Sequence, residues 1–159
     1  PFYMRMCRSK TPIIHNDSQE FQVGKAITMR EGSDCTIAAC GITVKMALDA
    51  ADLLNQDGIS CRVIDCFSIK PIDKELLEKA ARETGAIVTC EEHNVMGGFG
   101  SAVSEVVSES YPVPIRRIGV QDKFGESARD NEIAQLLEKH GMTPINITKM
   151  VKEARSQKQ

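Results

Sequence analysis

The stretch Ala86-Ile87-Val88-Thr89-Cys90-Glu91-Glu92-His93-Asn94-Val95-Met96-Gly97-Gly98-Phe99-Gly100 decides the fold. Its first five residues form an uncharged, β-prone run, which is typical of a strand covered on both faces. From residue 99 onward, apolar residues recur at positions 99, 102, 103, 106 and 107, the spacing of a helix that faces a core. A strand, a turn and a helix are the building unit of a parallel α/β sheet, and functional groups gather at the turn.

Strand and helix patterns alternate along the rest of the chain. Strands are predicted at residues 27–30, 35–40, 61–65, 86–90 and 115–120. Helices are predicted at residues 43–56, 73–85, 99–107, 131–139 and 143–154. This order predicts an α/β fold with three layers: a doubly wound, mostly parallel, Rossmann-like sheet of about five strands with helices on both faces and right-handed crossovers.

The first 22 residues differ from the remainder. Residues 2–6 alternate like a strand, whereas residues 9–22 are polar and rich in turn-forming residues, as expected of a linker between domains. Because the sequence opens directly in strand-like residues without an initiator methionine, we expect a fragment of a longer chain or a processed product.

Composition excludes several classes of protein. The 159 residues carry a formal net charge of -2 and no basic run, so neither nucleic acid nor a membrane surface is an expected partner. The six cysteines, at positions 7, 35, 40, 61, 66 and 90, include no C-x-x-C pair. We therefore expect reduced, buried thiols in a cytoplasmic protein rather than disulfides or a zinc site.

The glycines of the central turn admit two interpretations. Gly97, Gly98 and Gly100 could let a phosphate approach the N-terminus of the following helix. However, Val103 stands where the dinucleotide fingerprint needs glycine or alanine, and the chain has no G-K-[ST] sequence. Close packing of the helix on the strand is the favoured interpretation, and a nucleotide site is the alternative.

The charged residues of the same turn are ambiguous as well. Glu91, Glu92 and His93 could supply an acid–base pair, but a domain interface would use the same residue types. No second cluster completes a catalytic triad or a metal site. His15 and His140 are interpreted as structural. Arg5 and Arg8 could hold an anion, although spacing alone favours solvated charges.

Three ordered motifs give the sequence a specific resemblance. They are Asp65-Cys66-Phe67-Ser68-Ile69-Lys70-Pro71-Ile72-Asp73, then Glu91-Glu92-His93 with Gly97-Gly98-x-Gly100, then Asp122-Lys123-Phe124-Gly125-Glu126-Ser127. Nearly the whole chain resembles the C-terminal domain of transketolases, above all those encoded as two polypeptides. Ala128 departs from the pattern, because glycine usually follows the Glu-Ser pair.

The resemblance implies an enzyme larger than this chain. Transketolases use thiamine diphosphate and Mg²⁺ to move a two-carbon ketol unit between sugar phosphates. The cofactor-binding parts are absent here, so this chain is expected to bind no cofactor and to be inactive alone. Residues 1–22 would be the last strand of the preceding pyrimidine-binding domain plus a linker, and residues 23–159 the C-terminal domain. The expected partners are the upstream domains or subunit, in a homodimer or heterotetramer.

The resemblance also assigns site residues. Cys7-Arg8-Ser9 is similar to the family's Ser-Arg step, so Arg8 is expected to bind the phosphate of the sugar substrate, while Arg5 does not match that position. The family offers no catalytic or metal-binding role for the C-terminal domain. A role at an interface or near the active site is expected for Glu91, Glu92, His93, Gly97, Gly98 and Gly100.

Two alternatives remain open on the sequence. The chain could instead be the C-terminal part of a deoxyxylulose-phosphate synthase or of a 2-oxoacid dehydrogenase beta subunit, which share the Glu-Glu and Gly-Gly-x-Gly motif. A protein of another class, a regulatory module that binds a nucleotide or phosphate at residues 97–100, is the second alternative.

Overall fold

The computed structural model describes residues 1–7 and 10–158, apart from the side chain of Asp130, and contains one five-stranded sheet. The strands are β1 (Ile27–Arg30), β2 (Cys35–Ala39), β3 (Cys61–Asp65), β4 (Ile87–Asn94) and β5 (Ile115–Val120). Their order across the sheet is β1-β3-β2-β4-β5, and all pairings are parallel except that of β1 with β3. The predicted α/β fold with a mostly parallel sheet is confirmed.

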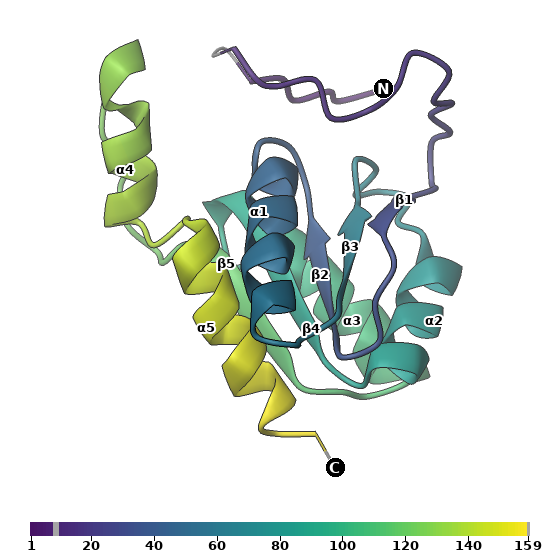
Figure 1. Cartoon of the computed structure of the whole chain (residues 1–159). Coiled ribbons are helices and arrows are strands. Elements are labelled where there is room, and N and C mark those ends of the chain that lie inside the picture. Colours follow the sequence, from purple (N-terminus) through teal and green to yellow (C-terminus); the bar gives the residue numbers. More distant parts are fainter. Residues whose placement is uncertain (8–9, 159) are drawn as a thin grey trace.

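Helices cover both faces of the sheet (Figure 1). On one face lie α1 (Thr43–Gln56) and α5 (Pro144–Arg155), and on the other lie α2 (Lys74–Thr84) and α3 (Phe99–Ser110). Successive residues of a strand point to opposite faces, so Ile37 and Ala39 pack with α1 and α5 while Ala38 packs with α2 and α3. This double burial explains why the strand sequences are continuously apolar rather than alternating.

Local signals fix the helix ends as predicted. The Asp73 carboxylate accepts a hydrogen bond from the amide of Leu76 and so caps α2, which ends at Gly85 with a φ of 66°. Thr143 caps α5 in the same way by accepting from the amide of Asn146, and Pro144 occupies the first turn of that helix.

Three predicted elements differ in the structure. Strand β4 runs beyond Cys90 to Asn94, because β5 continues to pair with it after an irregularity in register. The helix predicted at 131–139 is a 3₁₀ turn at Asp130–Glu132 followed by α4 (Ile133–Lys139). The strand predicted at residues 2–6 is not formed, because an extended segment becomes a strand only beside another strand that pairs with it.

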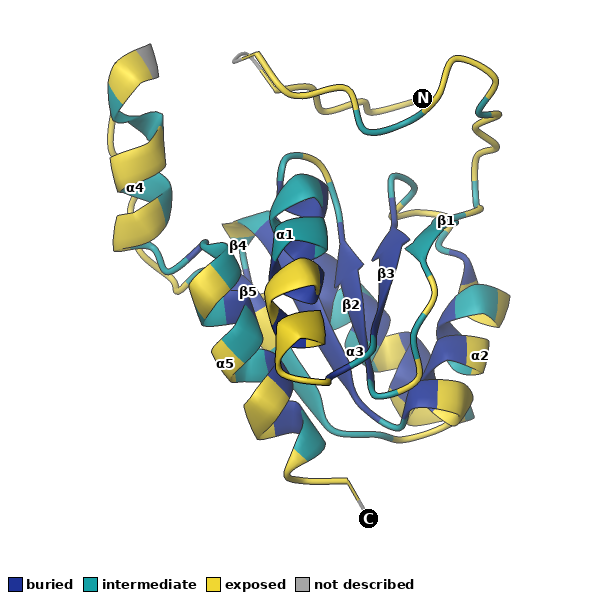
Figure 2. Cartoon of the chain, in the orientation of Figure 1, coloured by how far each residue is buried: buried dark blue, intermediate teal, exposed yellow. Residues whose placement is uncertain are grey.

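One end of the sheet carries the least buried parts of the molecule. Residues 1–7 and 10–22 cross beyond the carboxyl ends of β2 and β3, and α4 extends past the same end (Figure 1). Figure 2 shows that both parts are largely exposed, and α4 contains no buried residue. Within residues 1–7 and 10–158, no helix is both long and apolar enough to span a bilayer.

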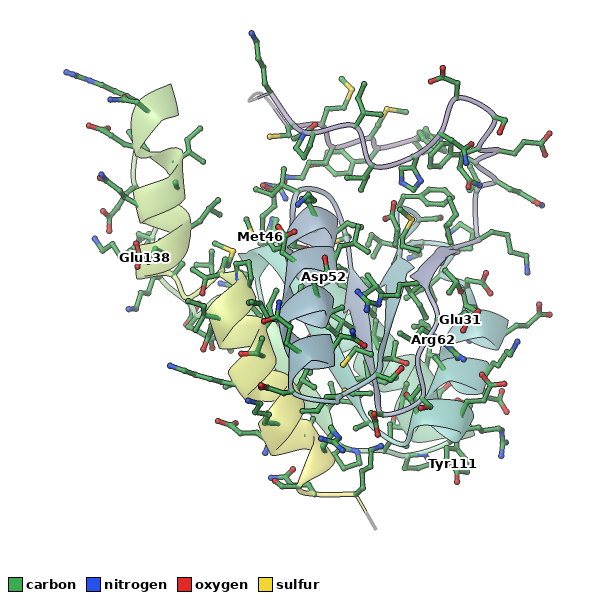
Figure 3. The ribbon with its side chains drawn as sticks, viewed as in Figure 1. Glu31, Met46, Asp52, Arg62, Tyr111 and Glu138 are labelled. Carbon is green, nitrogen blue, oxygen red and sulfur yellow. The ribbon has the colours of Figure 1, made fainter. Side chains whose placement is uncertain are left out.

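The buried Arg62 ties the opposite end of the sheet together. Its guanidinium donates to Glu31, in the loop after β1, at 3.1 Å (Figure 3). It also donates to Glu83, on α2, at 2.6 Å. Arg62 is buried while both carboxylates are solvent-accessible, so a charge at the edge of the core is paired twice.

The cysteines are free thiols, and all except Cys7 lie wholly or partly inside the core. Burial raises the pKa of Cys35 and of Cys40 to about 12 and that of Cys61 to about 11. Burial also raises the pKa of Cys66 and of Cys90 well above the ordinary value. These five groups are therefore thiols at neutral pH, and a thiol is a poor nucleophile.

Alkylation of the folded protein should thus be selective. We expect iodoacetamide at pH 7.5 to modify Cys7 at least roughly tenfold faster than any of the five core thiols, because they are both protonated and shielded. Mass spectrometry of the labelled peptides measures this, with protein in denaturant as the control in which all six react. Rapid labelling of Cys40 in the native state would contradict its inert character.

Candidate functional site

Glu91 links the end of the central strand to the start of the next helix. Its side chain is buried, and its two carboxylate oxygens accept hydrogen bonds from the amides of Phe99, at 2.7 Å, and Gly100, at 2.8 Å. These amides belong to the first turn of α3, where the helix dipole favours a negative charge. Glu91 is therefore an internal anion at the helix N-terminus, held by two charge-assisted hydrogen bonds.

The glycines of the turn make room for this contact. A Cβ atom at Gly98 would overlap the Glu91 carboxylate and the carbonyl oxygen of Asn94, and one at Gly100 would crowd the hydroxyl of Thr89. Gly97 has a φ of 71°, a conformation that glycine adopts without strain. The favoured interpretation, close packing of helix on strand, agrees with this geometry. A phosphate would have to displace Glu91, so the nucleotide-binding alternative is unsupported here.

Glu92 and His93 lie further along the same strand, and their side chains have separate contacts. The side chain of Glu92 is 18% exposed and lies 3.4 Å from the Arg5 guanidinium, measured from Oε1 to Nη1. His93 is exposed, and its Nδ1 accepts a hydrogen bond from the amide of Asn94. Among the described residues, no hydrogen bond or ion pair joins the side chains of Glu92 and His93. Arg8, the predicted phosphate ligand, lies outside the described residues.

A second acid–histidine pair lies at the carboxyl end of the neighbouring strand β3. The Asp65 Oδ2 lies 2.9 Å from the Nε2 of His15, and both side chains are largely buried. Burial raises the pKa of the Asp65 carboxyl, and the hydrogen bond from His15 opposes that rise. The structural role predicted for His15 agrees with this contact, but its partner was not predicted. No local pattern connects residues 50 positions apart, one of which is in a linker.

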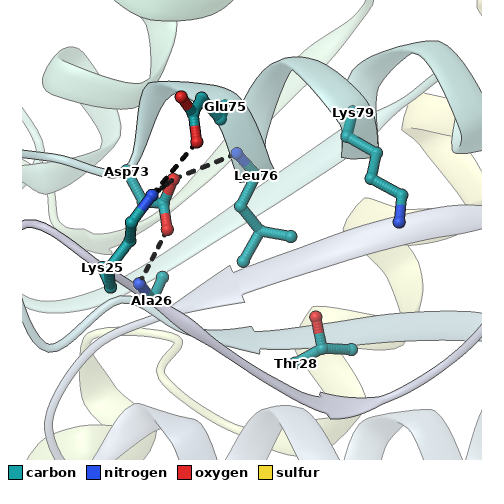
Figure 4. Close-up of a pocket in the computed structure, with 7 residues that line it drawn as sticks. All are labelled: Lys25, Ala26, Thr28, Asp73, Glu75, Leu76 and Lys79. Atoms are coloured by element: carbon teal, nitrogen blue, oxygen red, sulfur yellow. Dashed lines mark hydrogen bonds and ion pairs between the residues drawn. The ribbon is translucent and has the colours of Figure 1, made fainter. Parts of the chain in front are cut away.

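A shallow hollow beside β1 and α2 is lined by Lys25, Ala26, Thr28, Asp73, Glu75, Leu76 and Lys79 (Figure 4). Three of its polar side chains, Lys25, Asp73 and Glu75, are already paired. The Asp73 carboxylate accepts from the amides of Ala26 and Leu76, and the Lys25 ammonium donates to Glu75 at 3.1 Å. These contacts hold the start of β1 against α2.

The described residues do not fit thiamine diphosphate or its metal ion. Within residues 1–7 and 10–158, no group of three or more acidic, cysteine or histidine side chains could hold a metal ion. The N-terminus of α3, where a diphosphate would find backbone amides, already holds the Glu91 carboxylate.

Replacing Glu91 tests its structural role. We expect Glu91→Gln to lower the free energy of unfolding by about 2 kcal/mol, because an amide retains one acceptor oxygen and loses the charge that the helix N-terminus favours. Glu92→Gln is the matched control, since its ion-pair partner among the described residues is the partly exposed Arg5 and its expected loss is below about 1 kcal/mol. Urea unfolding followed by circular dichroism measures both. Equal losses in the two variants would show that Glu91 is no special anchor.

Several known proteins resemble this chain in sequence. Residues 24–147 match the family model described as transketolase, C-terminal domain. The 6-deoxy-6-sulfo-D-fructose transketolase subunit of Clostridium sp. is 42% identical over 99% of this chain and 48% of its own length. An apulose-4-phosphate transketolase subunit of Phocaeicola vulgatus is 46% identical over 84% of this chain and 43% of its length. The 1-deoxy-D-xylulose-5-phosphate synthase of Heliobacterium modesticaldum is 42% identical over 82% of this chain and 20% of its own length.

A solved structure is similar over almost the same range. It is described as a split-gene transketolase in an inactive beta4 tetramer, and it matches with a TM-score of 0.90 and 47% sequence identity. The match covers 96% of this chain and 49% of that one. The chain thus spans about half the length of the transketolase subunits that it resembles. Both the matching family model and the shared fold lead to one conclusion: the chain belongs to the transketolase C-terminal domain family.

Proposed function

We propose that this chain is the C-terminal part of a transketolase, which transfers a two-carbon ketol unit between sugar phosphates with thiamine diphosphate and Mg²⁺. The observation that carries the proposal is the 42% identity, over 99% of the chain, to a transketolase subunit. The cofactor and the metal ion are bound by the upstream part of the enzyme, and this chain contributes scaffold, assembly contacts and one substrate-binding arginine.

We propose further that the chain is inactive alone. The described residues offer no cluster of three or more metal-ligating side chains, and the N-terminus of α3 already holds the Glu91 carboxylate. The structurally similar split-gene transketolase is itself described as an inactive beta4 tetramer. Both observations support a chain that needs an upstream partner, in a homodimer of longer chains or in a heterotetramer.

The carboxyl end of the sheet is the proposed surface toward the upstream part. Glu92 and the exposed His93 lie there, and the described parts of the proposed strand and linker of the preceding domain, residues 1–7 and 10–22, cross the same end (Figure 1). Phe124, in the third sequence motif, has an exposed fraction of 97%, which is unusual for an aromatic residue without a partner. The free thiols support a reducing, cytoplasmic location.

A complementation assay tests the proposal. We expect no ketol transfer from xylulose phosphate to ribose phosphate by this chain with thiamine diphosphate and Mg²⁺, and activity once the upstream polypeptide is added. A coupled spectrophotometric assay measures turnover, and size-exclusion chromatography shows whether a complex forms. Activity of the chain alone, or a stable complex that still transfers nothing, would contradict the proposal.

Arg8 is the proposed ligand of the substrate phosphate. A guanidinium can bind a phosphate through two charge-assisted hydrogen bonds and thereby position the reacting carbonyl. In the assembled enzyme, Arg8→Ala should therefore raise KM for phosphorylated acceptors by roughly 10- to 100-fold, with little change for unphosphorylated ones. Arg5→Ala is the matched control, because Arg5 contacts Glu92 and should affect both acceptor classes equally. Equal effects of Arg8→Ala on both classes would refute the phosphate role.

A second candidate function is that of a deoxyxylulose-phosphate synthase, favoured by the relative from Heliobacterium modesticaldum. That synthase matches over 20% of its length, whereas the transketolase subunits match over nearly half of theirs. The substrate-binding residues of the upstream sequence distinguish the two enzymes.

A further inference from the structure

Residues 15–26 contact the first sequence motif at four successive points; this segment joins the end of the predicted linker to the residues that lead into β1, and it is called the linker below. His15, Phe21, Gly24 and Ala26 contact Asp65, Phe67, Ser68 and Asp73, and the contacts follow the same order along both segments. Each point joins one linker residue to one residue of the motif, so two segments about 50 positions apart are laid side by side. A series of specific contacts in matching order indicates that the motif binds the linker along its length.

The first contact involves the carboxylate of Asp65, which is largely shielded from water. Asp65 ends β3 with its side chain 7% exposed, and His15 lies 2.9 Å from its Oδ2. Burial raises the pKa of the Asp65 carboxyl, which means that its charged form depends on a partner. Removing the imidazole would leave a buried carboxylate without its side-chain partner.

The second contact is between aromatic rings, and it adjoins the first because the His15 ring also packs on Phe21. The rings of His15 and Phe21 meet edge to face with centroids 5.0 Å apart, and Phe21 meets Phe67 in the same manner at 5.1 Å. Edge-to-face pairs at these distances are favourable because the positive ring edge faces the negative ring face. Two linker side chains, those of His15 and Phe21, thus contact the motif at Asp65 and Phe67.

The third and fourth contacts use the linker backbone. The amide of Gly24 donates to the Ser68 hydroxyl at 2.9 Å, and that hydroxyl donates onward to the carbonyl of Pro71 at 2.7 Å. The amide of Ala26 donates to the carboxylate of Asp73, which also caps α2. Backbone contacts of this kind fix the direction of the chain as well as its distance from the domain.

We propose that residues 65–73 form a docking strip that fastens the linker, residues 15–26, to the domain and sets the course of the chain toward residues 1–7. The strip runs from the end of β3 to the N-cap of α2, and the linker contacts it at both ends. It gives a physical role to four residues of the motif, namely Asp65, Phe67, Ser68 and Asp73. The role concerns orientation, and it does not depend on which reaction the whole enzyme performs.

Hydrogen–deuterium exchange of this chain, followed by mass spectrometry, tests the strip. We expect His15→Ala to accelerate exchange in peptides covering residues 15–25 by roughly tenfold, since one charge-assisted hydrogen bond and one aromatic contact are lost. Ser68→Ala removes a single hydroxyl and should accelerate exchange around Gly24 by roughly threefold to tenfold. His140→Ala, at the end of α4, is the matched control and should change neither region.

Two further measurements make the result decisive. Peptides from β2 and β3 must keep their wild-type exchange, which shows that the variants remain folded. In the double variant His15→Ala/Asp65→Asn the linker should exchange about as fast as in His15→Ala alone, because the two side chains share one contact. Unchanged linker exchange in both His15→Ala and Ser68→Ala would overturn the proposal, as would equal acceleration in His140→Ala. If His15→Ala unfolds the domain, Ser68→Ala alone decides.

Discussion

The hydrogen bonds from the first turn of α3 to the Glu91 carboxylate constrain the end of β4, the turn after it and the start of α3. They place a charged side chain inside the core at the end of the central strand, and they require a residue without a Cβ atom at position 98, where a Cβ would overlap the carboxylate. The extension of β4 to Asn94, the glycines and the start of α3 are therefore parts of one arrangement.

That arrangement separates two roles that often coincide in α/β proteins. The end of a parallel sheet beside a glycine-rich turn usually receives a ligand, because helix N-termini attract anions there. Here the protein supplies its own anion, and the two neighbouring acidic residues, Asp65 and Glu92, are paired with His15 and Arg5 from the N-terminal segment. The same end of the sheet consequently binds a segment of chain, and its polar groups hold the domain to what precedes it.

The limits of prediction follow from the range of each interaction. Hydrophobic periodicity, Asp73 and Thr143 as caps, and Gly85 as a stop act within a few residues, so the elements and their order could be predicted from the sequence. The close-packing role of Gly98 could be predicted too, but the identity of its neighbour, Glu91, could not. A glutamate shortly before a glycine-opened helix was the available signal. The partnership of His15 with Asp65 carried no local signal, because it depends on how the linker folds back.

The distribution of apolar surface points to the same end of the sheet. The core is closed by α1 and α5 on one face and by α2 and α3 on the other, with its central strands buried throughout. Several large apolar side chains remain exposed at the carboxyl end, among them Phe2, Tyr3, Met6 and Phe124. Isolated exposed apolar residues are common, but a concentration on two segments at one end of a closed fold is a feature of protein interfaces. The domain thus buries its own core and leaves these apolar side chains uncovered, as is expected of a surface that packs against another part of a protein.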